Sequence, residues 1–133
     1  MKLGNTPRCC DQNLVNSYAH NYYSVLNRAL APSGETAEYF AKMRVQWLQE
    51  RLQRLGFALP SSVLDYGCGL GGSVPFLKEI LRPERILGVD IAPELLLQAR
   101  QKHAGETIKF ENCHHFFAHS DFQLAFCNGV FHH

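Results

Sequence analysis

The sequence predicts an α/β fold, a doubly wound parallel sheet with helices on both faces, and three observations support this class. After residue 60, short apolar segments of strand length alternate with segments of helical period. Four of the six residues that follow the first strand segment are glycine. Two further segments of helical period precede residue 60. Strands that alternate with helices form a parallel sheet, because each parallel connection needs a crossover.

Composition limits the protein class before any motif is considered. The chain has 133 residues, 46% of them apolar and 19% charged, which suits one globular domain and excludes a disordered or collagen-like chain. Thirteen Lys and Arg residues against twelve Asp and Glu give a net charge of +1, so we expect no nucleic-acid partner and no anionic membrane surface. No apolar run reaches membrane-span length, and the first ten residues do not resemble a signal peptide. We expect a cytoplasmic protein.

The cysteines and histidines do not form a metal-ligand pattern. The five cysteines are an odd number without C-x-x-C spacing, and we expect reduced thiols. Two histidine pairs, His114-His115 and His132-His133, lie near the C-terminus, but adjacent residues point in different directions on a helix or strand. We therefore expect no metal site, and for the second pair both helix packing and a place in a substrate pocket remain open.

The N-terminal part is expected to divide into a disordered tail at residues 1–10 and a helical segment at residues 11–60. The first helix is expected from Asp11 to the loop Pro32-Ser33-Gly34. The second is expected to begin after the N-cap Thr36 and to end before Gly56. Its apolar positions, expected to face the core, are Phe40, Met43, Trp47, Leu48, Leu52 and Leu55.

Residues 61–133 are expected to form the α/β half-domain. Pro75 and Pro93 each suit the first turn of a helix. The expected strands are 62–66, 85–90, 108–112 and 122–127, and the expected helices are 73–81 and 93–103.

The glycine-rich turn after the first strand predicts a nucleotide site. Gly67 and Gly69 allow a tight turn, partly with positive φ, and let a ligand approach the backbone. The glycines alone fit both G-x-G-x-x-G and G-x-G-x-G. In an open parallel sheet, a ligand lies beyond the carboxyl ends of the strands.

Two carboxylates narrow the class of ligand. Asp65 lies just before the turn, where its charge would repel a pyrophosphate but accept a hydrogen bond from an ammonium group. Asp90 ends the second strand, 23 residues after Gly67, where a carboxylate can accept both ribose hydroxyls. A ligand with an amine and a ribose but no phosphate satisfies both, and S-adenosylmethionine is such a ligand.

The segments VLDYGCGLGG and ILGVDIAPELLLQAR resemble motifs I and II of the class I S-adenosylmethionine-dependent methyltransferases, and FQLAFCNGVFHH resembles their fourth strand and the segment after it. The resemblance covers residues 61–133 and implies a Rossmann-like sheet in which the four strands have the order 3-2-1-4. It implies a methyl transfer to an acceptor that the sequence does not identify. No catalytic base is identified.

The resemblance also implies which residues bind the cofactor. By position, Asp65, Gly67, Cys68 and Gly69 would line the methionine moiety, and Asp90 would bind the ribose. The remaining residues assigned to the cofactor are Ile91 against the adenine, Asn112 or Cys113 as its polar contact through backbone groups, and Asn128 beneath the sulfonium.

The chain departs from the family pattern in two ways. The family sheet has seven strands, whereas this sequence supplies four, so we expect a fragment with weak or no activity alone. Strand 122–127 would then be an apolar edge, through which we expect a homodimer. In addition, Gln123 stands where many members have Asp, and Asn112-Cys113 stands where an acidic residue usually contacts the adenine.

Two other functions remain open. One is a catalytically silent module that binds the cofactor or a partner. The other is a nicotinamide-dependent oxidoreductase, which Asp65 disfavours because that turn usually follows an uncharged strand.

Overall fold

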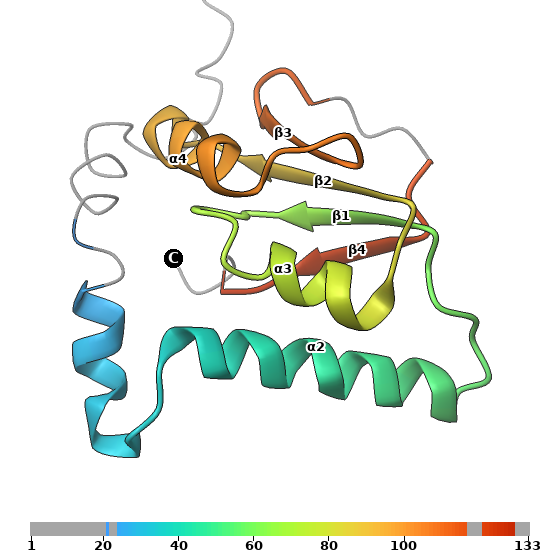
Figure 1. Ribbon diagram of the computed structural model, residues 1–133, viewed down its shortest axis with the longest axis horizontal. Coiled ribbons are helices and arrows are strands. Elements are labelled where there is room, and N and C mark those ends of the chain that lie inside the picture. The colour runs from blue at the N-terminus through green and yellow to red at the C-terminus, as the bar shows by residue number, and fades with distance from the viewer. Residues whose placement is uncertain (1–20, 22–23, 117–120, 130–133) are drawn as a thin grey trace, which may run out of the picture.

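The computed structural model describes residue 21 and residues 24–116 and 121–129. Its centre is a four-stranded parallel sheet in the order β3-β2-β1-β4 (Figure 1). The strands are β1 (Ser62–Tyr66), β2 (Arg85–Asp90), β3 (Ile108–Asn112) and β4 (Leu124–Cys127). The predicted order and direction are confirmed, and β4 begins two residues later than the sequence predicts.

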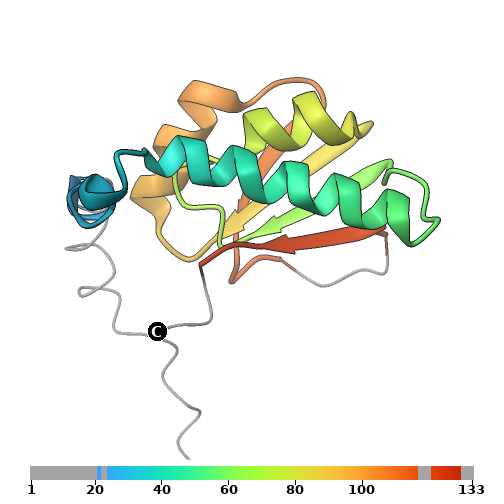
Figure 2. The same cartoon turned by 90° about the horizontal axis from the view of Figure 1, so that it is seen from below.

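The helices that pack against the sheet lie on one of its faces (Figure 2). They are α2 (Ala37–Arg54), α3 (Val74–Phe76) continued by η2 (Leu77–Leu81), and α4 (Pro93–His103). The chain moves outward from β1 to β2 to β3, and right-handed crossovers in one direction place their helices on the same face. Helices on both faces were expected, but the described part of the return from β3 to β4 contains no helix.

One row of apolar side chains across the sheet faces these helices. Leu124, Val63, Ile86 and Ile108 are register neighbours on β4, β1, β2 and β3. They belong to, or pack against, one core cluster that also holds Leu77 of η2 and buried residues of α2 and α4. The α2 helix therefore shares a core with the sheet. Within the residues described, no helix is long and apolar enough to cross a membrane.

The expected ends of α2 are confirmed. The Thr36 hydroxyl accepts a hydrogen bond from the Tyr39 N–H at 3.2 Å, as an N-cap does. At the other end Gly56 has φ 75°, and the Phe57 N–H donates to the Leu52 carbonyl, which closes the helix.

The predicted buried face of α2 is partly wrong. Met43, Trp47 and Leu55 were expected in the core, but they are 44%, 65% and 55% exposed. The residues that α2 buries are Ala41 and Val45, which are small enough to let the helix approach α3 and η2 closely. Leu48 packs beside them, and Phe40 and Leu52 are half-buried.

The N-terminal helix is described from residue 24 onward. Residues 24–30 are helical, and η1 (Ala31–Ser33) continues them to Gly34, whose φ of 73° ends the segment in the predicted loop. Val25, an apolar residue of this helix, is 56% exposed. In both views this helix lies on the side toward which the strands point (Figures 1 and 2).

The two edges of the sheet differ in their protection. At the β3 edge, the Arg100 guanidinium donates to the Phe110 carbonyl at 3.0 and 3.3 Å, and Lys109 and Glu111 add charge. The β4 strand, by contrast, reads Leu-Ala-Phe-Cys and contains no charge. Charged side chains on an edge strand discourage pairing with another chain, so β4 is the less protected edge.

Candidate cofactor site at the carboxyl edge

The residues assigned to the site meet at one edge of the sheet. The parallel strands β1, β2, β3 and β4 end together at Tyr66, Asp90, Asn112 and Cys127 (Figure 1). The nine residues that the sequence assigns to cofactor binding lie at these ends or within four residues of them. The topology therefore brings together segments that are up to 63 positions apart in the chain, from Asp65 to Asn128.

The glycine-rich turn folds back onto β2. Gly67, Gly69 and Gly71 have φ values of 74°, 54° and 75°, so the predicted left-handed backbone at the first two is confirmed and extends to the third. The N–H groups of Gly67 and Cys68 both donate to the Val89 carbonyl, at 2.7 and 3.0 Å. A Cβ at Gly69 would meet nothing within 4 Å, so this part of the turn faces open space.

Asp90 fixes the turn against the next loop. Its Oδ2 accepts a hydrogen bond from the Gly69 N–H at 2.8 Å, and its Oδ1 accepts one from the Ala92 N–H at 2.9 Å. An ionised carboxylate has about four acceptor positions, so each oxygen keeps capacity for another donor. The half-buried carboxylate is thus held in place by both oxygens while it can still accept hydroxyl donors.

Asp65 has a contrasting environment. It is 2% exposed, and its Oδ2 is a buried oxygen without a hydrogen-bond partner among the described residues. Burial, followed by the nearby charge of Asp90, raises the pKa of Asp65 to about 7. The environment of Asp65 therefore disfavours its ionised form in the free protein.

The end of β3 is tied to the loop after β2. The Asn112 amide donates to the Ile91 carbonyl at 3.2 Å, and its Oδ1 accepts from the His114 N–H at 3.0 Å. The Cys113 N–H donates to the Asp90 carbonyl at 2.9 Å. These bonds place Ile91, Asn112 and Cys113 side by side, and the Cys113 N–H is already engaged within the protein.

The end of β4 supplies Asn128, which is half-buried directly after Cys127. Gly129 follows with φ 79°, so the chain turns sharply here. Burial, and secondarily the charge of Asp65, raises the pKa of the Cys127 thiol, which keeps it protonated. His132 and His133, for which helix packing and a place in a substrate pocket were both open, lie outside the described residues.

Three supporting residues, Gly88, Phe110 and His103, were missed by the sequence analysis. A Cβ on Gly88 in β2 would lie 2.6 Å from the Phe110 ring and 3.0 Å from Cys68 Sγ. A Cβ on Gly71 would lie 2.9 Å from the His103 ring and 3.3 Å from Phe110. The Phe110 ring therefore fills the space between β2 and the turn, and His103 backs the turn from α4. A glycine in mid-strand, as Gly88 is, was the one sequence signal of this close approach.

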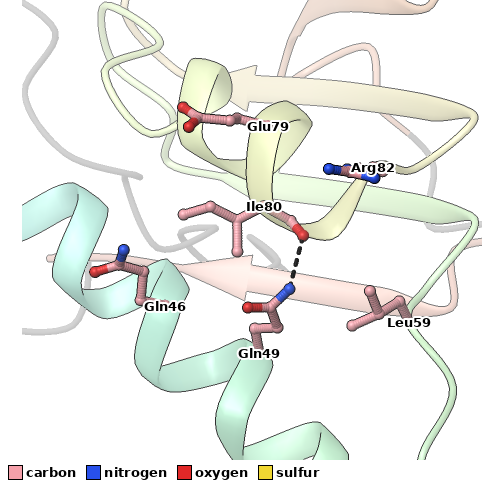
Figure 3. Close-up of a pocket in the computed structure, with 6 residues that line it drawn as sticks. All are labelled: Gln46, Gln49, Leu59, Glu79, Ile80 and Arg82. Carbon is pink, nitrogen blue, oxygen red and sulfur yellow. Dashed lines mark hydrogen bonds between the residues drawn. The ribbon is translucent and has the colours of Figure 1, made fainter.

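A cavity among the described residues lies elsewhere (Figure 3). It measures about 420 Å³ between α2, η2 and the loop before β1, and is lined by Gln46, Gln49, Leu59, Glu79, Ile80 and Arg82. Leu59 and Arg82 each lie three residues before a strand, so the cavity is near the amino ends of β1 and β2. Inside it, the Gln49 amide donates to the Ile80 carbonyl at 2.9 Å and satisfies the end of η2. This bond gives the Gln49 side chain a capping role at the end of η2.

Comparison with known proteins gives a consistent set of relatives. Residues 64–133, just over half of the chain, match the profile of the family described as "Methyltransferase domain". The chain is similar to trans-aconitate 2-methyltransferase of Rhodopseudomonas palustris strain BisB5, with 30% identity over 99 residues. It is also similar to the enzyme of that name from Methylobacterium nodulans, with 36% identity over 73 residues. These matches cover 74% and 53% of this chain but 39% and 28% of the relatives, so the chain spans well under half of their length.

Solved structures share the fold. The magnesium protoporphyrin IX methyltransferase of Synechocystis PCC 6803, solved with bound S-adenosylhomocysteine, superimposes with a TM-score of 0.57 at 18% identity, over 90% of this chain and 59% of that one. The amino pentose methyltransferase of Micromonospora echinaspora, solved with S-adenosylmethionine, gives a TM-score of 0.54 at 16% identity, over 94% and 44%. At these identities the likeness concerns the fold.

Proposed function

This chain belongs to the family described as methyltransferase domain, and from that membership we propose that it binds S-adenosylmethionine at the carboxyl edge of its sheet. The single observation that supports this most strongly is the geometry of Asp90. Its two oxygens hold the glycine turn and the following loop while keeping capacity for two more donors. The vicinal hydroxyls of a ribose are such a pair of donors.

The residues present fit the cofactor. The turn shows open backbone at Gly69, as the close approach of a ligand requires. The orphaned oxygen of Asp65 is an acceptor suited to a cationic group. In this proposal Gly67, Cys68 and Gly69 border the methionine end with Asp65, and Asp90 holds the ribose.

The remaining assignments complete the site. Ile91 would contact the adenine face, and the tied loop of Asn112 and Cys113 would border its edge. Asn128 would lie near the reacting end because it directly follows β4. When bound, S-adenosylmethionine supplies an electrophilic methyl group on a positively charged sulfur. The contribution of this chain is to hold and orient, since such a transfer depends mainly on the position of the reacting atoms.

We propose a small molecule as the methyl acceptor, which relatives named for trans-aconitate, magnesium protoporphyrin IX and an amino pentose support. Because the chain spans 39% of the relative from Rhodopseudomonas palustris, we propose that residues 1–133 alone bind the cofactor with weak or no methyl transfer. A silent binding module is the second candidate function, and the same short span supports it. Turnover of S-adenosylmethionine, measured with candidate acceptors, separates the two.

Isothermal titration calorimetry with S-adenosylmethionine, S-adenosylhomocysteine and NAD tests the binding site. We expect the two adenosyl ligands to bind and NAD not to bind. Asp90→Asn keeps one carbonyl acceptor and should weaken binding about ten- to a hundredfold, because a hydrogen bond to a charged group contributes about 1.5–3 kcal/mol. Unchanged affinity in this variant would remove Asp90 from the site, and binding of NAD alone would favour the oxidoreductase.

We also propose that residues 1–133 form a homodimer through β4. The Gln123 N–H donates to the Ser62 carbonyl, so the backbone of Gln123 faces β1. Because backbone groups alternate in direction along a strand, the N–H and C=O groups of Leu124 and Phe126 point away from β1. This outer edge has no charged residue, whereas the β3 edge has Lys109, Glu111 and the Arg100 contact. A second copy of the same edge offers complementary donors and acceptors.

Size-exclusion chromatography with light scattering tests the dimer. We expect Ala125→Lys, which places a charge on an exposed position of β4, to convert dimers to monomers. Ala104→Lys makes the same change at an exposed position after α4 and should leave the dimer intact. A monomeric parent chain at high micromolar concentration would contradict the proposal.

A further inference from the structure

Among the described residues at the carboxyl edge of the sheet, Asp65 is the one buried carboxyl group that has an oxygen without a hydrogen-bond partner. It lies on β1 with its side chain on the same face as Val63, beneath the helices, and it is 2% exposed. Its Oδ2 has no hydrogen-bond partner among the described residues. An ionised oxygen in such a place is costly unless it is paired, so the free protein favours a proton on Asp65.

Among the described residues, the groups that face Asp65 do not supply a positive charge. The turn contributes the Cys68 thiol, β4 contributes the Cys127 thiol, and β2 contributes the Asp90 carboxylate. Burial and Asp90 are the two causes that raise the pKa of Asp65 to about 7, and no cation in the described part of the chain opposes them. Arg100 of α4 is the described cation near this edge. Its charge opposes, as the smallest effect, the rise in the pKa of the Cys68 thiol, and its guanidinium donates to the Phe110 carbonyl.

The two carboxyl groups therefore differ in what they can do. Asp90 accepts two backbone N–H groups, one on each carboxylate oxygen. Asp65 lacks such donors on Oδ2, so its charge is the one that can change when a ligand arrives. A positive charge placed beside it would favour ionisation, whereas a neutral ligand would leave the proton in place.

We infer that Asp65 selects cationic over neutral ligands at this edge by exchanging its proton for the positive charge of the ligand. The inference rests on the proposed function and deepens it. The proton passes to solvent, and no covalent bond to the ligand forms. For an adenosyl ligand the cation is the ammonium of the methionine moiety, the sulfonium, or both, and the choice of ligands below separates them.

Calorimetry in two buffers of different ionisation enthalpy counts the protons released on binding. At pH 6 we expect S-adenosylmethionine to release about one proton, because Asp65 is then mostly protonated in the free protein. Its affinity should be about tenfold weaker at pH 6 than at pH 8, as one linked proton predicts. S-adenosylhomocysteine keeps the ammonium and lacks the sulfonium, and methylthioadenosine has neither. Methylthioadenosine should therefore bind without proton release.

Asp65→Asn is the decisive variant, because it preserves size and removes the titrating group. It should abolish both the proton release and the dependence of affinity on pH. Asp121→Asn makes the same change at an exposed position near the amino end of β4 and should leave both unchanged. Circular dichroism checks that each variant folds. If Asp65→Asn does not fold, the proton counts for the three ligands with the parent chain still decide the question.

The outcomes separate this inference from the proposed function. Binding of S-adenosylmethionine without proton release, or equal proton release by methylthioadenosine, would overturn the inference and leave the proposed function intact. Retention of the pH dependence in Asp65→Asn would also overturn it, by assigning the proton to another group. Failure of all three ligands to bind at either pH would contradict both.

Discussion

Asp65 and Asp90 are the same residue type at the ends of adjacent strands, yet they have opposite surroundings. Asp90 is a half-buried acceptor of two backbone N–H groups, and Asp65 is a buried carboxyl group with an orphaned oxygen. The difference arises from the turn, because its positive-φ glycines direct the Gly69 N–H toward Asp90. One carboxylate is therefore held by hydrogen bonds, while the other is the group whose pKa is raised to about 7.

The unfolding free energy of the ligand-free protein should depend on pH through Asp65. The pKa of Asp65 is raised from 3.8 to about 7 in the folded protein, so the folded state binds more protons than the unfolded state between these values. The unfolding free energy should therefore fall as pH rises from about 4 to about 7, by at most about 1.4 kcal/mol per pH unit from this group. Urea unfolding at pH 5, 6 and 7 measures it.

In Asp65→Asn this part of the pH dependence should disappear, and the variant should be more stable than the parent chain at pH 8. The control Asp121→Asn changes an exposed carboxylate and should retain the parental profile. A parental profile in Asp65→Asn would show that Asp65 is ionised in the folded protein.

The positions of these carboxylates could be predicted from sequence, and their environments could not. A strand is expected to end where an apolar run ends, so the positions of Asp65, next to the last residue of β1, and of Asp90, the last residue of β2, were predictable. The hydrogen bonds to Asp90 depend on how the turn folds back, which places Gly69 next to a residue 21 positions away. The packing of Phe110 against Gly88 likewise depends on the pairing of β3 with β2.

At the scale of elements, small residues decide how closely the segments pack. Gly88 in β2 leaves room for the Phe110 ring, which in turn supports Gly71 in the turn. Ala41 and Val45 allow α2 to lie against the core. The larger residues of α2 face outward because helix contact is made on the small-residue side.

Gly88→Ala should destabilise the protein by about 1–3 kcal/mol, since the added methyl would lie 2.6 Å from the Phe110 ring and overpacking costs about this much. Urea unfolding at fixed pH provides the measurement. Adding Phe110→Leu to Gly88→Ala should recover part of the loss, because the smaller side chain makes room. Gly105→Ala, where a Cβ meets nothing within 4 Å, is the matched control and should be nearly neutral. Equal stability of Gly88→Ala and Gly105→Ala would show that the ring can move aside.

Element boundaries were predictable where local chemistry sets them, as at Thr36, Gly56 and Pro93. Local chemistry did not indicate the buried face of α2, because apolar residues occur on two of its faces and only the neighbouring elements choose between them. The predicted helix 73–81 has the correct range, but its second half, η2, is a π-helix. Nothing in the local sequence distinguishes that pitch from the α pitch.

At the scale of the whole molecule, the helix at residues 24–30 lies on the carboxyl side of the sheet (Figures 1 and 2). The Asn27 side chain accepts a hydrogen bond from the Ala37 N–H at 3.2 Å, which ties this helix to the start of α2. A segment in this place can cover the cofactor end of the sheet, and its residues Tyr22 and Tyr23 lie outside the described residues.

Deletion of residues 1–30 should weaken binding of S-adenosylmethionine, by about tenfold if the segment contributes one hydrogen bond or equivalent contact. Calorimetry measures the affinity, and circular dichroism checks that the sheet domain keeps its fold. A truncated chain that binds as tightly as the parent would show that these residues serve packing alone.

The attachment of β4 has a consequence for synthesis on the ribosome. β1 lies between β2 and β4, so its second edge stays open until the chain has returned from β3. The return is closed by Ser62, whose hydroxyl donates to the Asp121 carbonyl and accepts from the Gln123 N–H, across about 60 positions. The Arg85 guanidinium donates to the same carbonyl and lies over the Phe122 ring. A nascent chain therefore carries an unpaired central strand for several seconds of translation at about 5–20 residues per second. During that interval β1, rather than β4, is the edge strand that is open to pairing with another chain.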